Sequence, residues 1–173
     1  MRRLMLLRHA KSDWPTGVDD HERPLAKRGR RASPLIGKYM QKEGLVPDLA
    51  VISTARRTQE TWKLALPAFS QSIARRDEPR IYEATTSSIL DTIHETCEDI
   101  NALLLVGHNP GLQSLALELT ATANRADLTW MWEKYPTGGL AVIDFDIESW
   151  RGVYPATGKL ERFVTPRLIN LAA

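Results

Sequence analysis

The chain has 173 residues, of which 43% are hydrophobic and 25% charged, and its formal net charge is +2. That length suits one domain with a core of its own, so we expect a single domain over residues 1–173. The composition is that of an ordinary soluble globular protein, and so small a net charge gives no argument for a nucleic-acid partner.

Apolar runs in this chain are short. The run Leu4–Leu7 resembles the start of a signal-peptide core, but Arg8 breaks it after four residues, which is too early for such a core. No stretch reaches the roughly 18 apolar residues of a membrane span. The one cysteine, Cys97, excludes an intramolecular disulfide and is compatible with a reducing compartment. We therefore expect a cytoplasmic protein with no membrane partner.

The first half of the chain alternates short apolar runs with helical periods. Leu4–Leu7 predicts a buried strand, and the spacing of apolar residues predicts a helix over 27–43. Leu49–Ile52 predicts a second strand, followed by a helix from about 55 to 66. Ile81-Tyr82 predicts a brief third strand.

The densest basic run, Lys27–Arg31, lies at the start of the first predicted helix. A run of this kind is usually a solvated helix face, and we interpret it so. A nucleic-acid-binding stripe would need further basic residues aligned with it, and none follow. We therefore expect no nucleic-acid partner.

The middle of the chain continues the alternation. Ser88 is expected to cap a helix. The inner face of that helix follows helical spacing: Ile89, Leu90, Ile93 and Cys97. The run Ala102–Val106 has no polar residue and is the clearest strand of the chain. Asn109-Pro110 then predicts the N-cap and first residue of another helix.

The last third contains a dense aromatic segment, Trp130–Tyr135, followed by a turn at Pro136–Gly139. The segment is expected to be core or the packed cover of a loop, with a hydrophobic lip that grips a partner protein as the alternative. Leu140–Phe145 alternates as a strand, and 161–164 is a further candidate strand.

Strands that alternate with helices predict an α/β fold, here a three-layer α/β/α sandwich. Its central sheet is expected to be mostly parallel, with an antiparallel late strand. Near-continuous apolar strands are typical of sheets covered on both faces. Ligands of such sheets bind beyond the carboxyl ends of the strands, so the functional residues are expected at that edge.

Three predicted strands end in unusual residues: Arg8-His9, Ser53–Arg57 and Gly107–Gly111. If the strands are parallel, two histidines and at least two arginines meet in one crevice. Arginine offers a planar fork of donors that matches phosphate oxygens. A helix that opens at Pro110 adds free N–H groups and the positive end of its dipole. These features predict a phosphoryl site.

Two imidazoles in such a crevice can have different chemical roles. A neutral imidazole is a nucleophile toward phosphorus, and a second, protonated one stabilises the equatorial oxygens. We expect the cationic surroundings to lower the pKa of His9 and so keep it neutral. Zinc would need a third ligand at a recognisable spacing, which is missing, and the arginines would repel a cation. We expect no metal and no cofactor.

The sequence resembles the histidine phosphatase superfamily, through four motifs in the family's order. They are Leu7–Ser12, Asp20–Leu25 with Gly29, Ser53-x-x-x-Arg57-x-x-x-Thr61, and Val106–Pro110. The usual Arg-His-Gly of the first motif has Ala10 here, as in many members of the SixA-like phosphohistidine phosphatase branch. The resemblance runs from residue 4 to about 120 and, with the late strand, covers nearly the whole chain.

The resemblance implies that His9 becomes phosphohistidine. It implies that Arg8, Arg57 and His108 hold the phosphoryl oxygens, and its motif selects Arg57 rather than Arg56.

The same family often carries a carboxylic acid between the second arginine and the second histidine, which protonates the leaving group and later activates water. Glu83, after the predicted third strand, is the first candidate, with an exposed strand-end carboxylate as the alternative. Asp91 and Glu95, on a predicted helix, are weaker candidates.

A histidine leaving from a phosphoramidate has a near-neutral pKa and needs less help from an acid than an alkoxide does. The segments on either side of Glu83 are short, which leaves an open crevice for a side chain of another protein. We therefore expect a phosphatase acting on phosphohistidine in a protein. The alternatives are a small-molecule phosphomonoesterase, a phosphoglycerate mutase-like enzyme, and an inactive phosphoprotein-binding module. Trp14 either lines the entrance or packs its loop.

Overall fold

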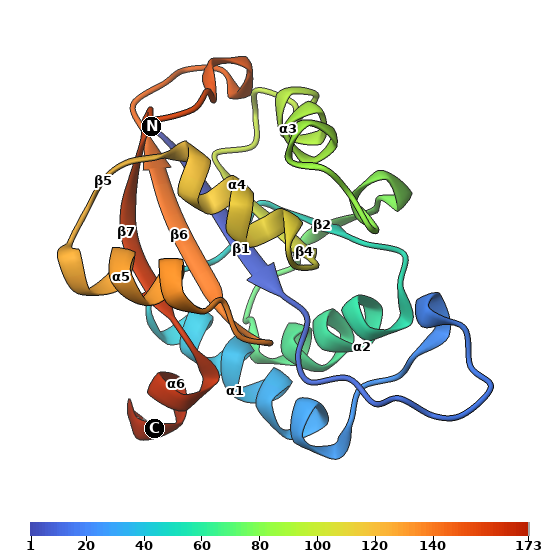
Figure 1. The fold of residues 1–173 in the computed structure, drawn as a ribbon. Coiled ribbons are helices and arrows are strands. Elements are labelled where there is room, and N and C mark those ends of the chain that lie inside the picture. The colour runs from blue at the N-terminus through green and yellow to red at the C-terminus, as the bar shows by residue number, and fades with distance from the viewer. Residues whose placement is uncertain (173) are drawn as a thin grey trace.

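The computed structural model describes residues 1–172 and contains one seven-stranded sheet with helices on both faces (Figure 1). The strand order is β3-β2-β4-β1-β6-β7-β5. The strands are β1 (Arg2–Arg8), β2 (Leu49–Ile52), β3 (Ala74–Asp77), β4 (Ala102–Gly107), β5 (Thr120–Ala123), β6 (Leu140–Phe145) and β7 (Gly158–Val164).

Most of the sheet is parallel. The pairs β1–β4, β2–β4 and β2–β3 are parallel, and β5 runs parallel to β7. β6 runs antiparallel to both of its neighbours, β1 and β7. The prediction of a mostly parallel sheet with a late antiparallel strand is therefore confirmed.

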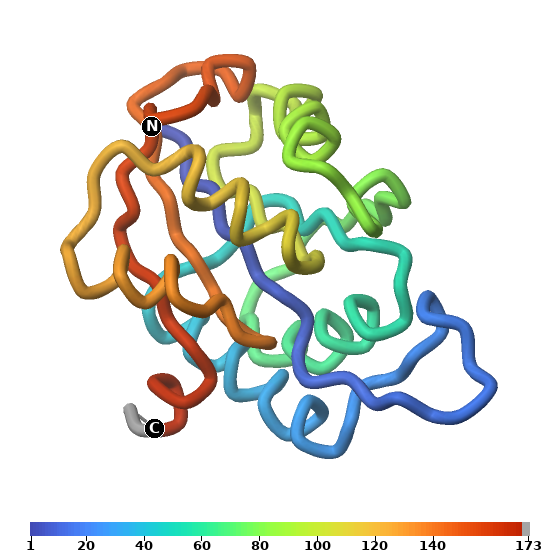
Figure 2. Tube along the Cα trace, in the orientation of Figure 1, coloured from blue at the N-terminus to red at the C-terminus, as the bar shows by residue number. Residues whose placement is uncertain are grey.

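Two layers of helices enclose this sheet. One layer contains α1 (Lys27–Lys42), α2 (Arg56–Ala65) and α6 (Pro166–Ala172); the other contains α3 (Thr86–His94), α4 (Gly111–Leu119) and α5 (Arg125–Glu133). Four 3-10 turns connect them: η1 (Asp20–Glu22), η2 (Leu66–Ala68), η3 (Pro79–Ile81) and η4 (Trp150–Gly152). The N-terminus and α6 lie at opposite ends of the sheet (Figure 2). Among residues 1–172, no helix combines the length and apolar character needed to cross a membrane.

The core follows the alternation of side chains along the central strands. Leu4 and Leu6 of β1 face the layer of α3, α4 and α5, whereas Met5 and Leu7 face the layer of α1 and α2. All four are fully buried. Burying one such side chain contributes about 1.5–3 kcal/mol. Two-sided burial explains why β1 and β4 read as unbroken apolar runs.

The predicted strands at Leu49–Ile52 and Leu140–Phe145 are confirmed, and the first helix, predicted over 27–43, ends at Lys42. The strand predicted at Ile81-Tyr82 is wrong, because Ile81 closes the 3-10 turn η3. The third strand is Ala74–Asp77, a polar edge strand without the apolar run that a sequence pattern detects.

Two predicted helix starts are displaced. Thr85, not Ser88, caps α3: its hydroxyl accepts the Ser88 N–H at 3.2 Å. Cys97 is exposed beyond the end of α3 instead of lying on its inner face. α4 begins at Gly111 with Pro110 as its N-cap, one residue later than predicted.

The aromatic segment Trp130–Tyr135 belongs mainly to α5 and divides between two environments. Met131 and Tyr135 are buried, whereas Trp130 and Trp132 are 46% and 71% exposed. The prediction of a core segment therefore holds for one face of the helix only. The Tyr135 hydroxyl donates to the Leu6 carbonyl, which fixes the segment against β1.

Candidate active site

The carboxyl ends of β1, β2 and β4 meet at one edge of the sheet, as parallel strands must. A cavity of about 440 Å³ opens there. The five residues that the sequence predicted first for the site line it: Arg8, His9, Arg57, Glu83 and His108. The start of α4 also lines it at Gly111, which brings the positive end of that helix dipole to the same cavity.

His9 directly follows β1 and is held by its own backbone and ring. Its N–H donates to the Gly107 carbonyl at 3.0 Å, and its Nδ1 lies 2.7 Å from the Ala10 carbonyl. Because a carbonyl can only accept, Nδ1 carries the hydrogen, and the lone pair of the neutral ring is on Nε2. Nε2 is therefore the ring atom whose lone pair is free to attack an electrophile.

The surroundings of His9 lower its pKa to about 3. Burial of the ring is the largest cause, and the charges of Arg57, Arg8 and Arg23 add to it. The sequence led us to expect the arginines as the cause, but desolvation outweighs them because the imidazole is only 5% exposed. His9 is thus neutral over the whole physiological range of pH.

The second imidazole, His108, follows β4 and lies with its ring centroid 5.4 Å from that of His9. Burial, followed by the charges of His9 and Arg57, lowers its pKa to about 3. Its Nε2 lies 2.7 Å from Ser53 Oγ. When this hydroxyl donates to Nε2, the hydrogen of the neutral ring is on Nδ1, which becomes a donor.

Three buried nitrogen atoms around this cavity have no hydrogen-bond partner within residues 1–172. They are Arg8 Nε, Arg57 Nε and His108 Nδ1. Buried polar groups are normally satisfied, so a cluster of unpartnered donors needs an explanation. An oxyanion with several acceptor oxygens would satisfy them together.

The motif Ser53-x-x-x-Arg57-x-x-x-Thr61 brings three side chains to the site at intervals of four residues. Ser53 precedes α2, and Arg57 and Thr61 lie on successive turns of this helix. Ser53 binds His108, Arg57 faces the cavity, and the Thr61 hydroxyl accepts the Ala10 N–H at 3.0 Å. Since residues four apart share a helix face, the spacing joins both histidine segments to one helix. Arg56, on the neighbouring position, is exposed and pairs with Glu60 at 3.3 Å.

Asp20 lines the cavity and begins the second motif, but the sequence predicted no role for it at the site. Arg57 donates to its carbonyl at 2.7 Å and to Oδ2 at 3.1 Å, and Arg23 Nε donates to Oδ1 at 3.0 Å. The Tyr82 hydroxyl donates to Oδ2 at 2.5 Å. The bond from Tyr82 first, with the two arginines adding, lowers the pKa of Asp20 to about 2.

This carboxylate therefore holds Arg57 and Arg23 at the cavity. Tyr82 also packs edge-on against the ring of His108, with centroids 5.4 Å apart, and burial together with the bond to Asp20 raises the pKa of Tyr82 to about 12. The partners lie 37 and 62 residues from Asp20 in sequence. No local pattern could have joined them.

Glu83 lines the cavity from a position different from the expected strand end. It follows the 3-10 turn η3 with a left-handed backbone (φ 49°), and its side chain is exposed. The weaker candidates do not reach the cavity. Asp91 lies on α3, and Glu95 pairs with Arg80 at 2.6 Å.

Trp14 is 73% exposed, and the Arg23 guanidinium lies 3.4 Å from its ring centroid. Because Arg23 lines the cavity, this cation–π pair places Trp14 beside the entrance rather than in a packed loop. Among the residues that the structure describes, no group of three or more His, Cys, Asp or Glu side chains could hold a metal ion.

Residues 4–85 match the histidine phosphatase superfamily, branch 1. An uncharacterized protein of Mycobacterium tuberculosis, Rv1276c, is 33% identical over 163 residues, which cover 93% of this chain and all of the relative.

Two solved structures share the whole fold. A candidate phosphohistidine phosphatase SixA from Agrobacterium tumefaciens is 28% identical with a TM-score of 0.78, covering 95% of this chain and 98% of its own. A second candidate SixA, from Nakamurella multipartitia, is 29% identical with a TM-score of 0.79, covering 95% and 96%.

Proposed function

The chain belongs to the histidine phosphatase superfamily, and on that premise we propose that it hydrolyses phosphohistidine in a protein through a phosphorylated His9. The observation that carries the proposal is the group of unpartnered nitrogen atoms, Arg8 Nε, Arg57 Nε and His108 Nδ1, on three residues that line the same cavity as His9. The likeness to two candidate SixA proteins at 28% and 29% identity supports the choice of substrate.

In the first step, His9 Nε2 attacks the phosphorus atom and the bond from phosphorus to the leaving nitrogen breaks. The Nδ1–H of His9 stays bonded to the Ala10 carbonyl and stabilises the ring as it becomes positive. In the second step a water molecule attacks the phosphorus, the Nε2–P bond breaks, and inorganic phosphate leaves. The burial that lowers the pKa of His9 keeps its lone pair available at every working pH.

The oxygen atoms of the phosphoryl group are held by donors from three strand ends. Arg57 and Arg8 supply charge and a fixed geometry. A phosphoryl dianion beside His108 opposes the causes that lower the pKa of that imidazole, so substrate binding promotes its protonated form. His108 then acts as a cationic donor only while the phosphoryl group is present.

Glu83 is our proposed proton donor to the leaving group and, in the second step, the base for water. It lines the same cavity as His9, and the exposure of its side chain allows exchange of protons with solvent. A leaving imidazole needs little protonation compared with an alkoxide. An acid at an exposed position is therefore sufficient for phosphohistidine and poorly suited to esters.

The substrate is tested by comparing kcat/KM for a phosphohistidine peptide, p-nitrophenyl phosphate and phosphoglycerates. We expect a preference of at least about 100-fold for the phosphohistidine peptide over the phosphoglycerates, whose alkoxide leaving group depends on the acid. p-Nitrophenyl phosphate, whose leaving group is much less basic than an alkoxide, measures phosphatase activity without that dependence. A clear preference for a phosphoglycerate or another small phosphoester would overturn the proposed substrate. Absence of turnover on all of them would favour a phosphoprotein-binding module.

A further inference from the structure

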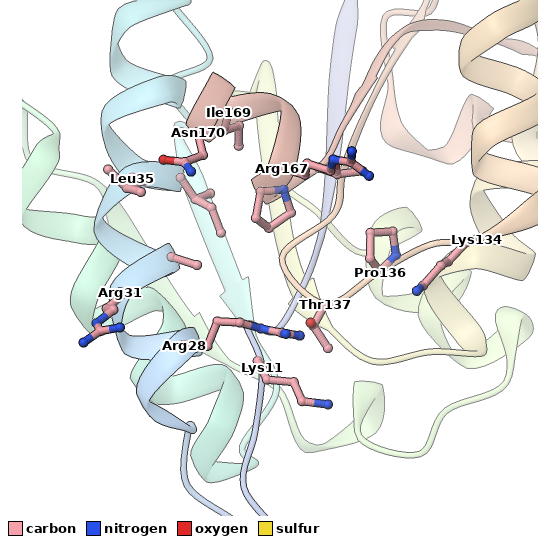
Figure 3. A pocket seen from close by; sticks show the side chains of 14 residues that line it. Lys11, Arg28, Arg31, Leu35, Lys134, Pro136, Thr137, Arg167, Ile169 and Asn170 are labelled. Carbon is pink, nitrogen blue, oxygen red and sulfur yellow. The ribbon is translucent and has the colours of Figure 1, made fainter. Parts of the chain in front are cut away.

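A second cavity, of about 760 Å³, opens next to the candidate active site between α1, α6 and the segment 134–137 (Figure 3). Its size lies within the range of ligand-binding pockets. We call it the basic groove. Its charged lining residues are Lys11, Arg28, Arg31, Lys134 and Arg167.

All charged side chains that line the basic groove are positive, and they come from four separate segments of the chain. None of the five is within ion-pair distance of a carboxylate in the described part of the chain. Other arginines, such as Arg3 and Arg162, do have such partners. Since like charges repel, unpaired cations around one groove favour an anionic ligand.

The wall of the basic groove is apolar. It is formed by Ala32, Leu35, Ile36, Pro136, Pro166 and Ile169. Arg28 and Lys11 extend toward Thr137 from one side, and Lys134 lies on the other side (Figure 3). A ligand that fits combines several negative charges with an apolar group. A nucleic acid, with charge but no aliphatic side chain, matches the cations and leaves the apolar wall unused.

The basic groove and the active site share one strip of backbone. Lys11 lies two residues after His9. The Gly138 N–H, next to Thr137, donates to the carbonyls of Arg8 and His9 at 3.1 and 2.9 Å. One extended ligand can therefore occupy both cavities at the same time.

We propose that the basic groove binds an acidic segment, carrying an apolar side chain, of the same protein whose phosphohistidine enters the active site. This inference rests on the proposed function. The five cations are exposed, so each contributes little by itself, and the affinity comes from their sum together with the apolar contact. The groove therefore selects among phosphoproteins without taking part in the chemistry.

The kinetic test uses two phosphohistidine peptides, one followed by glutamates around a leucine and one with serines in place of the glutamates. The native protein should have a KM at least about tenfold lower for the glutamate peptide, since several weak charge contacts add. The double variant Arg28→Glu/Arg31→Glu should lose that preference and keep its kcat on both peptides and on p-nitrophenyl phosphate. Equal KM values for the two peptides in the native protein would overturn the proposal.

The matched control is Arg125→Glu/Arg151→Glu, which makes the same change in net charge. Both arginines are exposed and lie outside the groove lining, Arg125 at the start of α5 and Arg151 in η4. The control should keep the preference for the glutamate peptide. An equal loss in both double variants would mean that net charge alone decides, which contradicts a localised groove.

Direct binding separates this inference from the proposed function. Fluorescence anisotropy with the unphosphorylated glutamate peptide should detect binding that Arg28→Glu/Arg31→Glu removes, even if no phosphohistidine is hydrolysed. Active turnover of phosphohistidine without any groove-dependent binding or KM effect would overturn the groove alone. Tighter, groove-dependent binding of an RNA oligonucleotide than of the peptide would overturn the choice of occupant.

Discussion

The candidate active site and the basic groove are neighbours that use positive charge in opposite ways. Arg57, in the active site, is 5% exposed and held by Asp20. Arg28 and Arg31, in the groove, are exposed and carry no ion pair within residues 1–172. Chemistry needs charges fixed before the substrate arrives, because reorganisation in the transition state is costly. Recognition of a protein surface tolerates mobile charges in water.

The sharpest test of this contrast is the replacement of one fixed charge and one solvated charge next to it in sequence. Arg57→Ala should lower kcat/KM by about 1,000-fold on every substrate, since it removes a charged donor from the transition state. Arg56→Ala, which removes an exposed arginine paired with Glu60, should change it less than about twofold. Steady-state kinetics on p-nitrophenyl phosphate measure both. Similar losses of kcat/KM in the two variants would contradict the distinction between fixed and solvated charges.

Among the charged residues of the active site, Glu83 is most like those of the basic groove, because its side chain is exposed. Glu83→Gln should slow hydrolysis of phosphoglycerates by about 100-fold and phosphohistidine hydrolysis by less than about tenfold, since only an alkoxide leaving group depends strongly on the acid. Asp91→Asn, on α3 and outside the cavity, is the control. Equal losses on both classes of substrate would rule out the leaving-group argument.

Gly29 joins the two regions, because a Cβ there would lie 2.1 Å from the Lys11 carbonyl oxygen. Gly29→Ala should therefore displace the backbone after His9, lowering stability by about 2 kcal/mol and kcat/KM by about tenfold. Gly37→Ala creates a similar clash, 2.2 Å from the Ala65 carbonyl, but away from the site. Denaturant unfolding should give a similar loss for both variants. If Gly29→Ala and Gly37→Ala also lose the same activity, the backbone next to Lys11 does not couple the basic groove to the active site.

The two buried imidazoles of the active site should make the stability of the fold depend on pH. In the folded protein the pKa of His9 and of His108 is about 3, well below the 6.5 of an ordinary histidine, so unfolding takes up protons once the pH falls below 6.5. Between pH 7.5 and 5.5, each imidazole should lower the free energy of unfolding by about 1 kcal/mol.

Denaturant unfolding at several pH values measures this loss, and His108→Asn should reduce its slope by about half. A variant with the full slope would show that His108 is not held neutral by burial.

The sequence predicted the parts of the fold that repeat a local pattern. β1 and β4 are covered on both faces and read as apolar runs, and the strands β2 and β6 matched their predicted bounds. The edge strands β3 and β5 were missed, because their exposed residues give no apolar signal. Candidate site residues such as His9 and His108 could be picked out for a related reason. They are polar and directly follow buried apolar strands, so they stand out in the sequence.

The parts of the site that depend on long-range contacts could not be read from the chain. Asp20 acquires its importance from Arg57 and Tyr82, which reach it from distant elements. The basic groove combines α1 with α6 and two loops, so the run Lys27–Arg31 correctly read as a solvated helix face without revealing what it lies against. The dominance of burial in lowering the pKa of His9 likewise depends on packing.

The central claim, that His9 accepts the phosphoryl group, is tested most directly by trapping the intermediate. The protein is incubated with a radiolabelled small phosphodonor, and the label is examined for stability in acid and base. We predict an acid-labile, base-stable label that maps to His9 and is absent from His9→Ala, while His21→Ala, a variant outside the cavity lining, keeps it. A label of the same kind and amount in His9→Ala would contradict the account.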